Sequence, residues 1–129
     1  MHTTAINPWS FSLALGFDQA QLVEGRRREL ICSAQDSVDE HGETQHPGDL
    51  PGQLGRSLDN LEGVLAEAQM SLTDVVRLNF YTTDVPALLQ NFTLVTDRFD
   101  GHRFATTVLG VAGLAGPELL IALEATAMD

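Results

Sequence analysis

The sequence predicts a mixed α+β domain in which two helices pack on one face of a β-sheet. Three observations lead to this prediction. Leu54–Ala68 and Leu88–Phe99 carry apolar side chains at helical spacing. Val75–Thr82 alternates between apolar and polar residues, as a half-buried strand does, and Leu119–Ala127 is a short apolar run typical of a buried strand. Each helix has a single apolar stripe, so both helices are expected to cover the same face of the sheet.

Length and composition limit the protein class. The 129 residues, 43% of them apolar, fit one domain spanning 1–129. No stretch approaches the roughly 20 apolar residues that cross a membrane, and residues 1–10 lack the pattern of a signal peptide. We therefore expect a cytoplasmic protein with no membrane partner. A net charge of −11, from 18 acidic and 7 basic residues, argues against a nucleic-acid partner.

Two local features have a functional and a structural interpretation. The single cysteine, Cys32, excludes an internal disulfide, and its apolar neighbours favour a buried core residue over a nucleophile. The adjacent residues Arg26–Arg28 could bind an anion, but a solvated hairpin turn is the preferred interpretation.

The N-terminal part is predicted to be extended. Between Trp9 and Phe17, large apolar residues alternate with smaller ones, which indicates an extended segment with one face packed against something large. Gln21–Glu24 and Glu29–Gln35 are predicted to be strands of a β-hairpin joined through Gly25.

Asp36–Gly52 is predicted to be a loop rich in acidic residues, glycine and proline. It contains His41 and His46, which raise the question of a metal site. Neither histidine belongs to a helical ligand pair or has a cysteine partner, so a solvated loop is preferred and no metal is expected.

The central part has the clearest periodicity. Apolar residues spaced by 4, 3, 4 and 3 positions predict the first helix: Leu54, Leu58, Leu61, Leu65 and Ala68. Ser71–Asp74 turns the chain into the strand Val75–Thr82, whose polar face carries Arg77, Asn79 and Tyr81. Asp84 as the N-cap and Pro86 in the first turn predict the start of the second helix. Phe104–Ala112 is predicted to be the next strand.

The last predicted strand contains one charged residue, Glu124. Alternation places Glu124 between Ala122 and Thr126 on one face, where small neighbours leave room for a cleft. A glutamate of an edge strand that simply faces solvent is the alternative. The sheet face opposite the helices is too polar for a second core, and we expect it to contact other subunits.

Several segments together resemble the RidA (YjgF) family, over nearly the whole range from Trp9 to Ala127. The resemblance implies a chorismate-mutase-like fold and a homotrimer with its helices outside and small-molecule sites in clefts between subunits. The segments are Cys32–Gln35, Ser57–Glu62, Asp74–Asp84, Gly110–Leu114 and Ile121–Ala127.

The family resemblance also implies an activity, the hydrolysis of reactive enamines and imines such as 2-aminoacrylate to a 2-keto acid and ammonia, without a metal or organic cofactor. By position, Glu124 corresponds to the family glutamate that positions or activates water. The positions that correspond to substrate-binding residues are Phe17, Ser33, Ala34, Gln35, Asn91, Thr106 and Val108.

The sequence departs from the family at two of these positions. Thr106 replaces the arginine that binds the substrate carboxylate, and Phe17 replaces a tyrosine. Arg103 is three residues from Thr106, so strand alternation directs it to the other face. An imine hydrolase is the preferred interpretation. The alternatives are a relative repurposed for a neutral substrate in a specialised pathway and a trimer that binds a metabolite without turnover.

Overall fold

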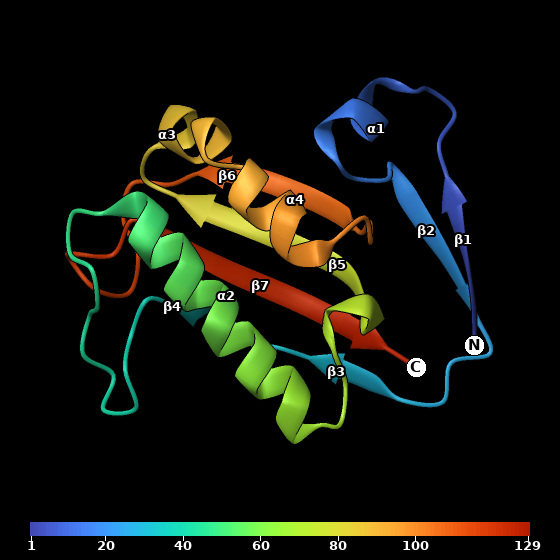
Figure 1. Cartoon of the computed structure of the whole chain (residues 1–129), viewed down its shortest axis with the longest axis horizontal. Coiled ribbons are helices and arrows are strands. Elements are labelled where there is room, and N and C mark those ends of the chain that lie inside the picture. Colours follow the sequence, from blue (N-terminus) through green and yellow to red (C-terminus); the bar gives the residue numbers. More distant parts are fainter.

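The computed structural model describes residues 1–129 and contains a mixed β-sheet with helices on one face (Figure 1). The strand order is β3–β7–β5–β6, with β4 also paired to β7. β5 pairs antiparallel with β7 and parallel with β6. These strands are β3 (Glu29–Ile31), β4 (Gln35–Asp36), β5 (Val75–Thr82), β6 (Ala105–Gly110) and β7 (Ile121–Met128).

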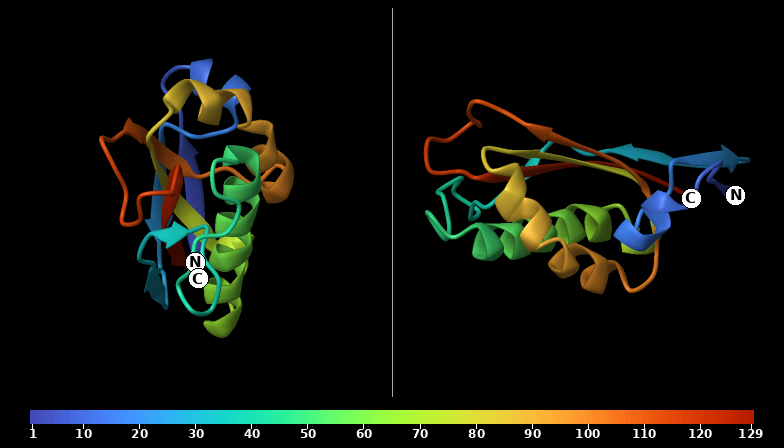
Figure 2. Two further views of the ribbon diagram at one scale, coloured as in Figure 1. Left: turned by 90° about the vertical axis from the view of Figure 1, so that its left-hand side faces the viewer. Right: turned by 90° about the horizontal axis from the view of Figure 1, so that it is seen from above.

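Three helices, α2 (Leu50–Glu67), α3 (Val85–Gln90) and α4 (Thr93–Phe99), lie on the same side of this sheet (Figure 2). The predicted fold class is therefore confirmed. None of the helices has both the length and the apolar character needed to cross a membrane.

The core lies between α2 and the sheet. The predicted leucine stripe of α2 is completely buried, and its neighbours on β5 and β7 come from the alternating apolar positions. The helix begins at Leu50, four residues before the stripe, because Asp49 accepts a hydrogen bond from the Gly52 N–H at 3.0 Å. The sheet residues of this core are Val75, Leu78, Phe80, Ile121, Leu123, Ala125 and Ala127.

The second predicted helix is divided into α3 and α4. Asp84 is the N-cap, as predicted, and accepts a hydrogen bond from the Ala87 N–H. Asn91 ends α3, and its side-chain amide donates to the Ala87 carbonyl at 2.8 Å. Leu88 of α3 and Val95 and Phe99 of α4 all lie in the core.

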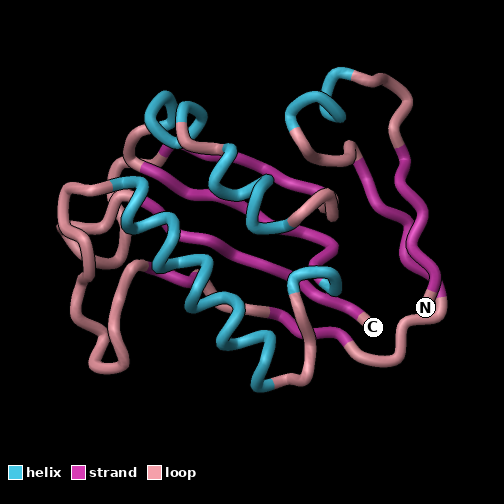
Figure 3. The backbone as a smooth tube through the Cα atoms, in the orientation of Figure 1, coloured by secondary structure: helices cyan, strands magenta, loops and turns pink.

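The predicted N-terminal arrangement is wrong in two respects. β2 (Ala20–Glu24) pairs with β1 (His2–Ile6) rather than with β3, and this hairpin projects beside the main sheet (Figure 3). β3 pairs with β7 instead. In addition, Phe11–Leu15 forms a short helix, α1, which ends at Gly16 in the left-handed conformation with φ of 89°.

Arg28 stabilises the junction where β3 meets β7. Its guanidinium forms an ion pair with Asp129 and donates to the Ala68 carbonyl at 2.9 Å. These contacts join the start of β3, the end of α2 and the end of the chain. Of the three arginines predicted to form a solvated turn, Arg26 and Arg27 are exposed, and Arg28 is partly exposed and makes these contacts.

The segment between β4 and α2 forms an excursion at one end of the sheet, as predicted (Figure 3). His41 and His46 are exposed there. No cluster of three or more histidine, cysteine or acidic residues in the chain has the arrangement to hold a metal ion.

Candidate functional site

Glu124 lies on β7, in the interior of the sheet and on the face opposite the helices. β7 has β3 and β4 on one side and β5 on the other, so the interpretation of Glu124 as an edge-strand residue is wrong. Its direct partner on β5 is Asn79, whose side-chain amide donates to Oε1 at 3.3 Å. The Tyr81 hydroxyl donates to the same oxygen at 2.8 Å. Oε2 has no hydrogen-bond partner within the chain and remains free to bind water or a ligand.

The hydrogen bond to Glu124 raises the pKa of Tyr81 above its ordinary value, with burial as the second cause. Ionised tyrosine would place a second negative charge against the carboxylate. The sequence places Asn79 and Tyr81 on the polar face of β5 but contains no motif that assigns them to the site. Only the pairing register of β5 with β7 shows that they hold Glu124.

Replacement of Glu124 by glutamine is expected to lower the pKa of Tyr81 toward its ordinary value, because the carboxylate that disfavours the phenolate is lost. Tyr81 is the only tyrosine of the protein, so tyrosinate absorbance during an alkaline titration reports this residue alone. The matched control is Glu118→Gln, a change at an exposed glutamate just before the same strand. An unchanged titration curve in Glu124→Gln would contradict the hydrogen bond.

Ser33 and Ala34 pass beside Glu124 on the side opposite Tyr81. The Cys32 N–H donates to the Ala125 carbonyl at 2.9 Å, and Gln35 pairs with Leu123, so the two intervening residues bulge away from β7. Both are exposed, and their N–H groups bind no backbone carbonyl. This bulge offers free donors beside the carboxylate, where a ligand could accept hydrogen bonds.

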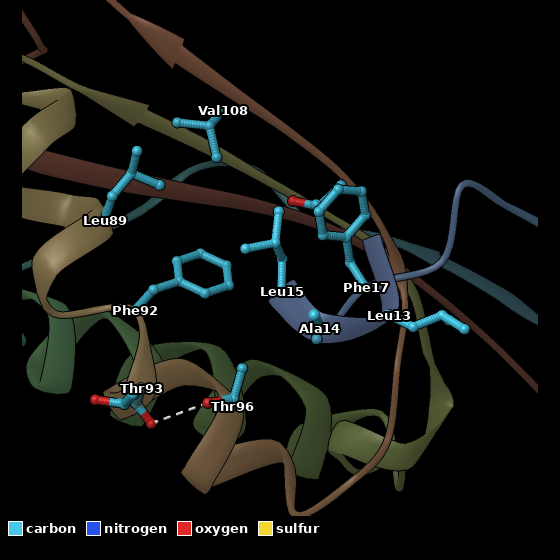
Figure 4. A pocket seen from close by; sticks show the side chains of 11 residues that line it. Leu13, Ala14, Leu15, Phe17, Leu89, Phe92, Thr93, Thr96 and Val108 are labelled. Atoms are coloured by element: carbon cyan, nitrogen blue, oxygen red, sulfur yellow. Dashed lines mark hydrogen bonds between the residues drawn. The ribbon is translucent and has the colours of Figure 1, made fainter. Parts of the chain in front are cut away.

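A second group of predicted residues lines a pocket of 510 Å³ between α1, β6 and the α3–α4 pair (Figure 4). Phe17, Thr106 and Val108 are among the lining residues. Asn91 is adjacent in sequence to the lining residue Phe92, but its side-chain amide is already bonded to the Ala87 carbonyl. The complete lining is Leu13, Ala14, Leu15, Gly16, Phe17, Leu89, Phe92, Thr93, Thr96, Thr106 and Val108.

The sheet separates these two groups within one chain. In the parallel register of β5 and β6, Thr106 pairs with the core residue Leu78, and therefore faces the helices. Thr107 pairs with Asn79 and lies on the face of Glu124. The predicted site residues thus form a carboxylate group on one face and an apolar pocket on the other.

The pocket contains no charged side chain. Arg103 does not supply the missing cation, because its guanidinium lies 3.7 Å from the carboxylate of buried Asp18. Cys32 is buried in the core as predicted, and burial raises the pKa of its thiol, which disfavours the nucleophilic thiolate.

Residues 17–129 match the family described as Endoribonuclease L-PSP. The chain is similar to a protein of unknown function of the conserved Rid family from Yersinia pestis, with 34% identity over 100% of both chains and a TM-score of 0.89. No curated protein matches the sequence.

Two further solved structures are similar. A putative endoribonuclease from Thermotoga maritima is 30% identical, with 88% of this chain and 86% of that chain covered and a TM-score of 0.71. A member of the YjgF/YER057c/UK114 family from Mycobacterium tuberculosis is 23% identical over 99% of this chain and 100% of that chain. Its TM-score of 0.68 indicates a shared fold.

Proposed function

Because this chain belongs to the Rid (YjgF) family, we propose that it forms a homotrimer that hydrolyses a reactive enamine or imine in clefts between subunits. Glu124 positions or activates the attacking water. The observation that carries this proposal is the geometry of the carboxylate. Its Oε1 is held by two donors while its Oε2 is unbonded on a face without covering helices.

The surface charge supports a small molecule over a nucleic acid, although the family description and the similar Thermotoga maritima protein bear the name endoribonuclease. Acidic residues outnumber basic ones by 18 to 7, and the chain has no lysine. Five of the seven arginines are within 4.0 Å of a carboxylate. Little basic surface is left to neutralise phosphates.

Hydrolysis at this site requires one proton acceptor. As water attacks the imine carbon, the Glu124 carboxylate accepts a proton from that water, and a carbinolamine forms. The same carboxyl group returns this proton to nitrogen and then carries the hydroxyl proton of the carbinolamine to nitrogen as well, so that the carbon–nitrogen bond breaks, ammonia leaves and the oxygen becomes the carbonyl of the product. An enamine enters this sequence after tautomerising to its imine.

The separation of the two site groups supports an arrangement in which each cleft is built from two subunits. Thr106 and Glu124 lie on opposite faces of one sheet, so a cleft that contains both requires a second copy. Exposed apolar side chains provide surfaces for such contacts. They include Trp9 at 67% exposure, Phe11 at 60%, Leu15 at 57% and Ile31 at 77%.

Mixed assemblies test this proposal. Glu124→Ala removes the carboxylate, and Thr106→Trp fills the pocket, so each variant alone is expected to be inactive. Unfolding the two together in equal amounts and refolding them should restore about one quarter of the wild-type rate, since that fraction of sites receives an intact pocket from one subunit and Glu124 from another.

Turnover is measured as ammonia release from imines generated in situ, both from amino acids by an amino-acid oxidase and from uncharged amines by an amine oxidase. Light scattering on the same samples should give three times the chain mass. A mixture that stays inactive although both variants assemble would refute the composite site. Full activity of Glu124→Ala alone would refute the role of the carboxylate.

A further inference from the structure

We propose that the apolar pocket binds an uncharged ligand, whose apolar body lies among the helices and whose neutral polar group faces the free edge of β6. That the ligand is an imine or enamine rests on the function proposed above. That the ligand is uncharged and mostly apolar is inferred from the pocket alone. The expected substrate class is an imine derived from an uncharged amine, with an alkyl or aryl side chain, rather than one derived from an amino acid.

The apolar body is assigned from the side chains that face the cavity. Leu15 on α1 and Phe92 before α4 point toward one another across the pocket, with Leu89 and Val108 beside them (Figure 4). A volume of 510 Å³ lies within the range of about 300–1,000 Å³ typical of small-molecule sites. The pocket is therefore large enough for a metabolite with a substantial apolar group.

The three threonines of the pocket offer an anion no positive charge, and the hydroxyls of two of them are already bonded. The Thr96 hydroxyl donates to the Thr93 carbonyl at 3.2 Å, and the Thr106 hydroxyl donates to the Leu78 carbonyl. With their hydroxyl protons already engaged, Thr96 and Thr106 have none left to donate to an anion. A carboxylate placed there would lose its hydration without gaining a charged partner, which is strongly unfavourable.

Neutral hydrogen-bonding groups are available along β6. This strand pairs with β5 on one side and is the outer strand on the other. The Asp18 N–H donates to the Phe104 carbonyl at 3.1 Å, at the start of this outer edge. Beyond that contact, residues 106–110 make no backbone hydrogen bond except in the pairing with β5. Their outward N–H and carbonyl groups suit an uncharged polar group such as an imine or a carbonyl.

Binding of the neutral fluorophore N-phenyl-1-naphthylamine, whose emission rises in apolar surroundings, tests this inference without turnover. Phenylacetamide and phenylacetate, which share a shape and differ in charge, serve as competitors. We expect phenylacetamide to displace the fluorophore at a concentration at least about tenfold lower than phenylacetate, because only the amide enters the pocket without an unpaired charge.

Two variants locate the binding to this pocket. Thr106→Arg should weaken fluorophore binding by about tenfold and reverse the preference toward phenylacetate, because it adds a cation to the apolar lining. Leu89→Asp, at an exposed wall residue, should weaken the fluorophore without altering a strand. Leu94→Asp is the matched control, since Leu94 is exposed on α4 and outside the lining.

Equal displacement by the two competitors in the wild type would overturn the inference. So would identical fluorophore binding in the wild type and both pocket variants. These results are independent of the catalytic proposal: normal imine hydrolysis by Glu124→Ala would refute water activation by that residue but leave the ligand class of the pocket intact.

Discussion

Glu124→Gln is expected to lower the rate of imine hydrolysis by at least ~100-fold, the lower range for the loss of a general base. Glutamine has the same shape and its Oε1 can still accept hydrogen bonds from Tyr81 and Asn79. It cannot take a proton from water. The variant should therefore retain its fold and its fluorophore binding while kcat falls, as measured by ammonia release and by thermal unfolding.

Two further variants make this result specific. Tyr81→Phe keeps the carboxylate and removes one of its two donors, a loss of about 1 kcal/mol that corresponds to roughly a fivefold lower rate. Glu118→Gln changes an exposed glutamate just before the same strand and should keep the full rate. If Glu124→Gln kept the wild-type rate, a group other than Glu124 would have to activate the water.

The sequence predicted those elements whose pattern reports burial directly. The leucine spacing of α2 and the alternation along β5 each reflect one buried face, and the structure places both faces in the core as predicted. The pairing partners of the strands could not be predicted in the same way. β2 and β3 are consecutive and separated by a glycine turn, which favours a local hairpin, but β3 is bound to the distant strand β7. The Arg28–Asp129 ion pair beside this pairing joins residues 101 positions apart.

The N-terminal error has a similar cause. Phe11–Leu15 contains three large apolar residues at every second position, which fits a strand, but within this chain these side chains are largely exposed. A segment without a packed face leaves no burial pattern to identify. The left-handed residue Gly16 is compatible with ending a helix, and here it does so.

Individual residues of the candidate site could be proposed from the sequence, but their arrangement in space could not. Glu124 stands out in the sequence as the one charge of an apolar strand, and Thr106 stands out by its difference from the family pattern. Their placement on opposite faces depends on the register of β6 against β5, since a shift by one residue would exchange Thr106 with Thr107. Tyr81 and Asn79 can be assigned to the site only from the pairing register of β5 with β7, because neither residue belongs to a sequence motif with a known chemical role.

Gln53→Leu is expected to lower the free energy of unfolding by about 3 kcal/mol, the largest stability effect that the structure predicts for a single polar side chain. Gln53 is completely buried on α2. Its amide donates to the carbonyls of His46 at 3.1 Å and Glu118 at 2.9 Å, and its Oε1 accepts from the Leu120 N–H at 2.8 Å. Leucine has a similar size but leaves the Glu118 carbonyl and the Leu120 N–H without partners, while the His46 carbonyl keeps only the bond from the Asp49 N–H.

Chemical denaturation measures this difference, with Gln90→Leu as the matched control. Gln90 is exposed at the end of α3, where the same substitution should change stability by no more than about 0.5 kcal/mol. Hydrogen exchange at the Leu120 amide should rise in Gln53→Leu beyond the global loss of stability, because this amide loses its acceptor. Equal stability of Gln53→Leu and wild type would mean that other groups replace these three bonds. The start of β7, and with it the position of Glu124, would then be fixed by the pairing with β5 rather than by α2.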